Sequence, residues 1–279
     1  MFTAVLLKST YKDGKPGRLT KAHEMAEHHR FKKNYLFKNL AISKECYALR
    51  LIQHFLIIDA IEGCLKNLTE SDKTTLSPFF ALSYLEHLWR SKAIQRDLQQ
   101  LDVDPQHIEE KNIASKTRDY VVAIKQLAPK QLLAHFLLHL AGFMHGGKVI
   151  QTKYIGPSNR ITSYQISTHQ YDFETAASLL PRQPAFTLDV YKDMMSAIDA
   201  IPLSEPEMED LLCECEKVYQ HMTEIYDELC EKQAKPLKKW CYFLIPIGLG
   251  LIILGGALSR IGNDNSADAE DQSAMMPSI

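Results

Sequence analysis

The sequence lacks the features that mark several large protein classes. Its 279 residues include only 12 glycines and 12 prolines, too few for a collagen-like or low-complexity chain. The mean hydropathy of −0.20 argues against a polytopic membrane protein, and the net charge of −2 gives no reason to expect nucleic-acid binding. With 46% apolar residues, the chain can bury a sizeable core, so we expect one large globular domain or two small ones.

The chain also has too few cysteines for a disulfide framework. It contains six, and the N-terminal MFTAVLLKSTYKDGK has too short an apolar run for a signal peptide. We therefore expect reduced thiols in a cytosolic environment. Cys213 and Cys215 are close in sequence, but two-residue spacing on a helix points them about 200° apart, and a closed metal site needs four ligands.

One long apolar run lies near the C-terminus. Residues 240–258 (WCYFLIPIGLGLIILGGAL) contain no charge, carry Trp240 and Tyr242 at one end and follow a lysine-rich stretch. A run of about twenty apolar residues with such flanks is typical of a membrane span. We predict a basic linker over 234–239, a single C-terminal transmembrane anchor over 240–258 and a short acidic tail over 259–279. The lysines place the main domain in the cytoplasm; a buried core helix is the alternative.

Residues 1–233 are predicted to form one all-α domain. Apolar residues recur at steps of three and four, and sustained period-two alternation is nearly absent. Ser204 and Glu207 form a capping box that predicts the start of the clearest helix. Residues 161–167 alternate only briefly and are expected to form a loop. Further helices are expected over residues 19–40, 43–65, 79–99, 105–127, 129–155 and 186–198.

The fifth predicted helix is unusual because of its glycines. Gly142, Gly146 and Gly147 lie in its middle, where each costs about 1 kcal/mol relative to alanine. Missing side chains allow close approach of another helix or of a large flat ligand, and spacing alone favours helix packing. Because His139 and His145 lie beside these glycines, a ligand site becomes the stronger hypothesis.

Three segments resemble parts of the heme oxygenase family. LTKAHEMAEHHRF (19–31) is similar to the family's first helix, whose T-x-x-H-x-x-A-E pattern supplies the proximal iron ligand. AHFLLHLAGFMHGGKVI (134–150) is similar to the distal helix, whose core GDLSGG reads GFMHGG here, and DVYKDMM (189–195) to the propionate-contacting helix. A terminal anchor also occurs in eukaryotic members. The likeness covers roughly residues 15–233 and implies a single-domain heme oxygenase-like helical bundle plus one C-terminal transmembrane helix.

The resemblance implies that His23 binds the iron of heme b. His23 and Glu27 are spaced i, i+4 on one helix, so the carboxylate can hold the imidazole Nδ1–H and orient Nε2 for metal binding. A solvated surface histidine is the alternative. Heme propionates need basic neighbours, and the resemblance suggests Lys192, Arg18 and Lys21 for that contact.

The distal half departs from the family pattern. The family's catalytic Asp, which orders water beside the iron, aligns with Phe143, and its Tyr on the second helix aligns with Leu56. Its neighbouring Arg and Ser align with His139 and His145. Phe and Leu cannot form these hydrogen bonds, and losing such a network typically costs orders of magnitude in rate. The glycines, with Gly142 in the catalytic set, are expected to lie against the porphyrin.

Two functions therefore stay open. In the first, the protein cleaves heme to a biliverdin-type product with release of iron and CO. An external reductase or ascorbate supplies electrons, and His139 or His145 replaces the Asp in holding distal water. In the second, the protein binds heme without turnover, as a sensor, store or carrier, and one of these histidines can close the sixth iron position. His139 can also be an ordinary hydrogen-bonded core residue.

The same fold hosts non-heme di-iron oxidases and thiaminases, which are lesser alternatives. Glu24 and His28 form an E-x-x-x-H pair, and Asp59 and Glu62 add carboxylates on the next predicted helix. A di-iron site needs two such motifs from facing helices, but residues 131–155 contain no Asp or Glu. The thiaminase alternative lacks its cysteine pattern.

Overall fold

The computed structural model describes residues 1–12 and 15–259. For residues 11–12 and 234–259 it describes the backbone alone. The side chains of the predicted linker and anchor, and nearly all of the predicted tail, therefore lie outside the described residues. Within the described part of the chain, no helix combines the length and apolar character needed to cross a membrane.

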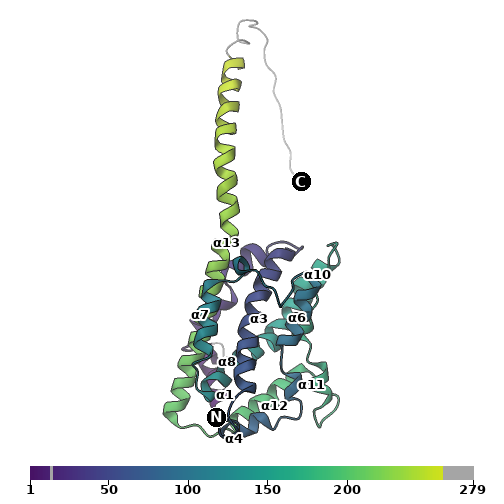
Figure 1. Cartoon of the computed structure of the whole chain (residues 1–279), viewed down its shortest axis with the longest axis vertical. Coiled ribbons are helices and arrows are strands. Elements are labelled where there is room, and N and C mark those ends of the chain that lie inside the picture. Colours follow the sequence, from purple (N-terminus) through teal and green to yellow (C-terminus); the bar gives the residue numbers. More distant parts are fainter. Residues whose placement is uncertain (13–14, 260–279) are drawn as a thin grey trace, which may run out of the picture. The chain divides into compact units, whose positions relative to one another are not determined.

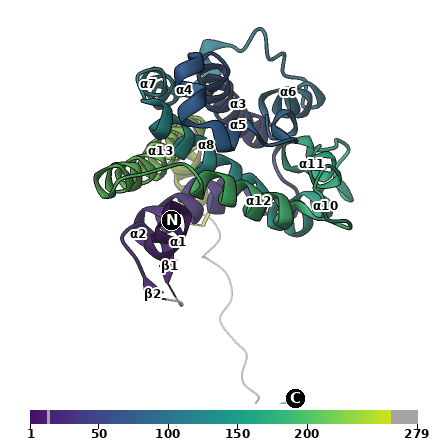
Figure 2. The same ribbon diagram turned by 90° about the horizontal axis from the view of Figure 1, so that it is seen from below.

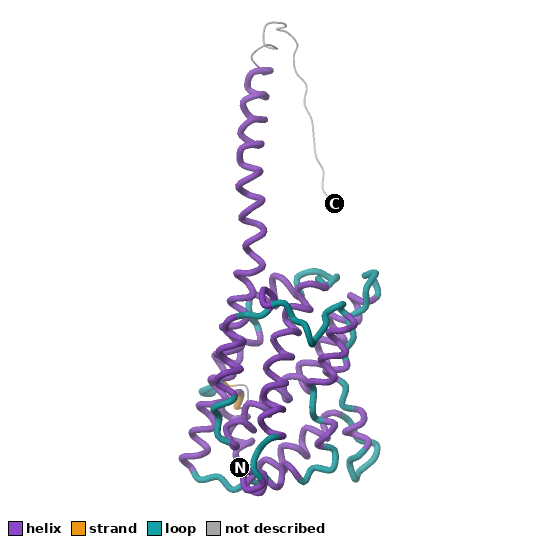
Figure 3. Tube along the Cα trace, in the orientation of Figure 1, coloured by secondary structure: helices purple, strands orange, loops and turns teal. Residues whose placement is uncertain are grey.

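The chain divides into two units, Met1–Glu231 and Lys232–Ile279. Helices make up most of the first unit, with loops and turns between them, which confirms the predicted all-α class (Figure 3). A pair of two-residue antiparallel strands, β1 (Tyr11–Lys12) and β2 (Lys15–Pro16), precedes the second helix. The α-helices are α1 (Phe2–Thr10), α2 (Thr20–Glu27), α3 (Lys44–Lys66), α4 (Glu70–Thr75), α5 (Ser77–Phe80), α6 (Ser91–Gln100), α7 (Ser115–Ile124), α8 (Pro129–Ala141), α9 (Gly147–Ile150), α10 (Gly156–Asn159), α11 (Glu174–Ser178), α12 (Thr187–Asp199) and α13 (Glu205–Ser259).

Shorter helical segments connect several of these elements. The π-helical segments are η1 (Lys32–Leu36), η4 (Gly142–Gly146) and η5 (Gln151–Ile155), and the 3₁₀ turns are η2 (Leu85–His87), η3 (Glu110–Asn112) and η6 (His169–Tyr171). The stretch predicted as one helix over 129–155 is confirmed as a continuous helical run, in which α8, η4, α9 and η5 follow one another.

Helix α3 lies at the centre of the first unit (Figures 1 and 2). It packs against α6, α7 and α8, and most of its residues are buried. A helix that is apolar on several faces is expected to be surrounded in this way. The start of α3 depends on a local contact. The Ser43 side chain accepts the N–H of Cys46 at 3.2 Å, and Ser43 is the first residue of the predicted helix.

The predicted helix over 79–99 is wrong, because α5 ends at Phe80 and α6 begins only at Ser91. Glu62, on α3, accepts the backbone N–H groups of Arg90 and Ser91, the latter at 3.1 Å, and the Ser91 hydroxyl at 2.6 Å. These N–H groups have no partner inside their own helix. A carboxylate from another helix thus marks where α6 begins.

Two more predicted helices are shorter in the structure than the sequence pattern indicated. The one over 105–127 is α-helical only from Ser115, where Glu228 of α13 accepts the N–H groups of Ser115 and Lys116 at 2.9 and 3.0 Å. The one over 19–40 is interrupted after Glu27, and His29 Nδ1 accepts the N–H of Phe31 at 3.1 Å before the chain resumes a helical path.

The remaining predictions agree with the structure. The Ser204–Glu207 capping box is present, with the Ser204 N–H donating to Glu207 Oε2 at 2.8 Å, and α13 begins at Glu205. Helix α12 closely matches the predicted 186–198, and residues 161–167 form a loop.

Helix α1 was not predicted. At its start, Asp199 of α12 accepts the N–H and the hydroxyl of Thr3 at 2.9 and 2.6 Å.

Candidate functional site

Gly142 and Gly146 present bare backbone on one side of the π-helical segment η4. A Cβ atom placed on either glycine would meet no atom within 4 Å. A Cβ on Gly147 would instead lie 2.4 Å from Cδ1 of Tyr171, so this glycine lets η6 pack closely. Gly147 thus serves close packing, while Gly142 and Gly146 leave open space beside the backbone. Wide turns of this kind are frequent at functional sites.

His145 lies exposed on η4, beside helix α12. Its ring stands edge-on to the ring of Tyr191, with the centroids 4.3 Å apart. Partial burial lowers the pKa of His145, so its imidazole is neutral at pH 7. Lys192, next to Tyr191, is exposed. The structure therefore brings His145 close to the segment expected to contact propionates.

Phe143 points away from this side of η4 and into the core. It is 3% exposed, and its ring centroid lies 6.0 Å from that of His54 and 6.1 Å from that of Tyr171. Leu56 is half-buried against the same core. Phe143, which the resemblance aligns with the family's Asp, therefore fills interior space.

His139 belongs to a buried hydrogen-bond network. Glu214 Oε2 lies 3.1 Å from His135 Nε2, and the Tyr120 hydroxyl lies 2.9 Å from His135 Nδ1 and 3.2 Å from His139 Nε2. All four side chains are buried, and Lys217 donates to Glu214 at 2.6 Å at the surface end. Burial lowers the pKa of His139 to about 3, so its ring is neutral. The structure places His139 as a hydrogen-bonded core residue.

His23 lies on α2 with Glu27 one turn away. Its Nδ1 is 3.6 Å from Glu27 Oε2, and its ring stands edge-on to Tyr219 of α13. Burial lowers the pKa of His23, although Glu27 acts in the opposite direction. A neutral imidazole is the form that binds a metal. Because Nδ1 faces the carboxylate, Nε2 points to the other side of the ring.

The three basic residues suggested for propionates differ in their surroundings. Arg18 forms ion pairs with Glu209 and, at 3.6 Å, with Glu216, so its guanidinium joins the start of α2 to α13. These ion pairs occupy Arg18. Lys21 and Lys192 are exposed, and their ammonium groups are accessible to an anionic ligand.

His54 was not singled out from the sequence, yet it lies next to Phe143 and His139. It is buried on α3, and its Nε2 lies 3.0 Å from the hydroxyl of Tyr226. The Tyr226 ring stacks on Phe31, which follows α2, with centroids 5.8 Å apart. The one sequence feature that could have indicated His54 is the presence of a histidine within a strongly apolar helix. Through Tyr226 the structure joins the segment after α2 to the interior side of η4.

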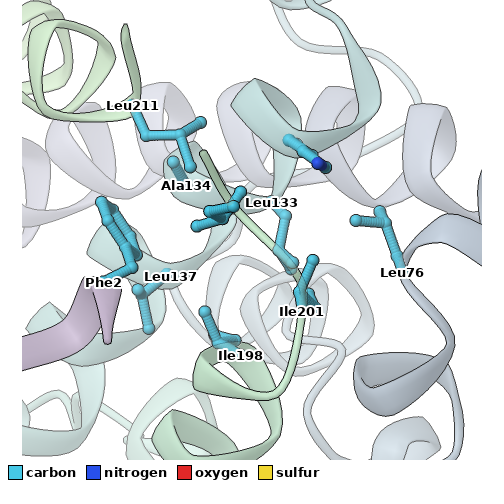
Figure 4. Close-up of a pocket in the computed structure, with 10 residues that line it drawn as sticks. Phe2, Leu76, Leu133, Ala134, Leu137, Ile198, Ile201 and Leu211 are labelled. Carbon is cyan, nitrogen blue, oxygen red and sulfur yellow. The ribbon is translucent and has the colours of Figure 1, made fainter. Parts of the chain in front are cut away.

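Two hollows of the first unit lie away from these residues. The pocket in Figure 4 is lined almost entirely by apolar side chains, among them Phe2, Leu137 and Ile198, and its volume of about 10 Å³ holds about one water molecule. A second hollow of about 270 Å³ lies at the surface near Arg90 and His169. Among the described residues, no three His, Cys, Asp or Glu side chains come together as a metal site.

Comparison with known proteins identifies the family. The heme oxygenase family model matches residues 18–228. The chain belongs to the heme oxygenase family. This heme oxygenase family member is 26% identical to a heme oxygenase of Porphyra purpurea over 214 residues (75% of this chain, 82% of the relative). It is 25% identical to one of Rhodella violacea over 220 residues (75% and 83%).

Solved heme oxygenases share the fold of this family member. The heme complex of heme oxygenase-1 from Synechocystis sp. PCC 6803 aligns with a TM-score of 0.65 at 18% identity, covering 88% of this chain and 99% of that one. The Leptospira interrogans heme oxygenase aligns with a TM-score of 0.61 at 20% identity, covering 81% and 98%. The heme oxygenase fold predicted from the sequence is therefore confirmed.

The residues of this heme oxygenase family member fit a heme. Gly142 and Gly146 leave open space beside the helix backbone, and His23 has an imidazole with a lowered pKa whose Nδ1 lies 3.6 Å from Glu27 Oε2. Both are properties of the described side chains and backbone themselves. Phe143, in contrast, offers no hydrogen bond and faces the core.

Proposed function

We propose that this protein binds heme b and cleaves it to a biliverdin-type product with release of iron and CO. An external reductase or ascorbate supplies the electrons. The observation that carries the proposal is the combination, in one heme oxygenase chain, of the His23–Glu27 pair with the bare backbone at Gly142 and Gly146. Heme, when bound, supplies the iron at which dioxygen is reduced.

The chain's own residues then take distinct roles. His23 holds the iron through Nε2 while Glu27 orients the ring from the Nδ1 side. Lys192 and Lys21, which are exposed, pair with the propionates. His145 holds the distal water in place of the missing Asp, since its neutral imidazole lies on η4 next to Gly146.

Adding hemin to the purified full-length chain tests heme binding. A Soret band is expected for the wild type and is expected to be lost in His23→Ala. His28→Ala is the matched control, because His28 is an exposed histidine near the end of the same helix. An unchanged Soret band in His23→Ala would show that another residue binds the iron.

Binding without turnover is the second candidate function, and the buried Phe143 favours it. This side chain offers no hydrogen bond at the position where the family has its catalytic Asp. Ascorbate or a reductase added to the heme complex separates the two functions. Decay of the Soret band with rising biliverdin absorption supports cleavage. A stable low-spin six-coordinate spectrum that becomes high-spin in His145→Ala supports binding alone.

A membrane tether is part of the proposed function. The charge-free run 240–258 and the preceding lysines support a C-terminal anchor with the main domain on the cytoplasmic side. We expect the full-length chain to float with lipid vesicles. Ile252→Lys, which puts a charge at mid-span, should release it, whereas Gln272→Lys in the tail should not. A wild-type chain that stays with the aqueous fraction refutes the tether.

A further inference from the structure

Arg50 is a buried cation, and one of its hydrogen-bond donors has no partner. It lies on α3, is 4% exposed, and its Nε has no hydrogen-bond partner. Its remaining described contacts are weak: one terminal nitrogen lies 3.5 Å from the Tyr171 hydroxyl, and the guanidinium lies 5.8 Å from the Tyr47 ring centroid. Burying a charge in this way is costly unless an opposite charge and hydrogen bonds compensate.

Lys32 is a second cation directed to the same region. Its ammonium donates to the carbonyl of Ala26 at 2.8 Å and lies 5.0 Å from the ring centroid of Tyr226. Burial, and then the positive charge of Arg50, lower the pKa of Lys32 to about 7. Within the described part of the chain, no carboxylate lies within ion-pair distance of Lys32 or Arg50. Arg50 is buried and Lys32 is half-buried, and the charge of Glu27 also acts on Lys32.

His54 adds a third polar group whose hydrogen bonding is incomplete. It lies one turn after Arg50 on α3, so both side chains are on the same face of the helix. Its Nε2 is 3.0 Å from the Tyr226 hydroxyl, and its buried Nδ1 has no hydrogen-bond partner. When Tyr226 donates to Nε2, the hydrogen of the neutral ring is on Nδ1, which can then donate to an anion.

These groups come from α3 and η1 and are linked through Tyr226 of α13. Tyr226 contacts both Lys32 and His54, and the Arg50 and Lys32 charges both act on His54. The charge of Lys32 also acts on His23, so the cluster lies near the proposed iron ligand. Arg50 Nε and His54 Nδ1 are two hydrogen-bonding atoms without a partner, and Arg50 and Lys32 add two positive charges.

We propose that Arg50, Lys32 and His54 form an internal binding site for a carboxylate. A carboxylate accepts several hydrogen bonds in its plane, and a guanidinium, an ammonium and an imidazole N–H are suitable donors. Two sources have this chemistry: a carboxylate of the tetrapyrrole itself, or a free small carboxylate. The first source rests on the heme binding proposed above. It would turn one propionate inward, leave the other to Lys192 and Lys21, and so set how the macrocycle is seated.

The test compares Arg50→Met and Lys32→Met with Lys33→Met, a matched control in which the exposed neighbour loses its charge. In the first arm, each full-length variant is titrated with ferric protoporphyrin IX and with its dimethyl ester. If the tetrapyrrole supplies the carboxylate, the wild type and Lys33→Met prefer the diacid, and the other two variants lose at least about tenfold of that preference.

In the second arm, acetate is added to the heme-free chain and the thermal unfolding midpoint is measured. If a free carboxylate occupies the site, acetate raises the midpoint of the wild type and of Lys33→Met but not of the other two variants. This arm needs no heme, so it decides the anion site even if the protein binds no porphyrin. If Arg50→Met does not fold, Lys32→Met carries both arms. Unchanged diacid preference together with no acetate effect overturns the proposal.

Discussion

Gly142→Ala and Gly147→Ala are expected to have opposite effects on the heme-free protein. Both exchange a helical glycine for alanine within six residues of each other, so the backbone contribution is similar. They differ in what the new methyl group meets. At Gly142 it meets no atom within 4 Å, whereas at Gly147 it lies 2.4 Å from Tyr171 Cδ1.

The magnitudes follow from these contacts. Alanine is favoured over glycine by about 1 kcal/mol in a helix, which applies to both positions. At Gly147 the methyl must displace the ring of Tyr171, which is 6% exposed and lies against Phe143. Forcing a methyl into a packed interior costs about 1–3 kcal/mol. The unfolding free energies of the two variants should therefore differ by about 1–3 kcal/mol, with Gly142→Ala the more stable.

The assay combines unfolding with heme titration. Urea and thermal unfolding of the heme-free variants, followed by far-UV circular dichroism, give the order of stability; each kcal/mol corresponds to about 2–4 °C for a unit of this size. In a Soret titration, Gly142→Ala should bind heme more weakly than the wild type although it is the more stable protein. The reason is that the new methyl group occupies the side proposed to receive the porphyrin. If Gly142→Ala binds heme as tightly as the wild type, heme does not lie against this backbone. If Gly147→Ala is as stable as Gly142→Ala, the packing argument is wrong.

Three further outcomes can be measured. The pKa of buried His139 is about 3 and that of His54 is also well below its usual value, so the unfolded state binds more protons below pH 6.5. Stability should therefore fall from about pH 6.5 towards pH 3, by about 1 kcal/mol per pH unit for His139, with His54 acting in the same direction, and urea midpoints of His139→Gln should show a shallower slope. Phe143→Asp should lower the unfolding free energy without raising biliverdin formation per bound heme, because it places a carboxylate in the core next to His54, whereas Phe143→Leu should cost less stability; faster biliverdin formation in Phe143→Asp would show that this side chain reaches the ligand side. Glu62→Ala should lower the unfolding free energy by about 2–4 kcal/mol, because it leaves buried N–H groups at the start of α6 unpaired, and Glu62→Gln should cost less; denaturant unfolding checks both.

Local sequence patterns predicted features that depend on residues within a turn or two. The start of the helix predicted over 43–65, the Ser204–Glu207 capping box and the loop over 161–167 all appear as expected. The His23–Glu27 pair depends only on i, i+4 spacing, and the two side chains do face each other on α2.

Local sequence patterns could not predict whether a side chain faces the ligand side of its helix or the core. The motif GFMHGG placed Phe143 beside the glycines, but whether its ring faces the ligand side or the core depends on His54 and Tyr171, which lie far away in sequence. Arg18 appeared available for a propionate until the structure paired it with carboxylates of α13. No sequence pattern marks the buried Arg50 or the half-buried Lys32, because a charged residue in a sequence shows nothing of its burial.

The sequence by itself determined that this chain is helical, and its segments resemble the heme oxygenase motifs, with Phe143 where the resemblance implies the distal Asp. Only the tertiary structure decided where several helices begin. Asp199, Glu62 and Glu228 each accept N–H groups at the start of a helix distant in sequence. The physical reason is that helix periodicity arises from neighbouring residues, whereas the unpaired N–H groups of a helix start accept any carboxylate that folding brings within reach.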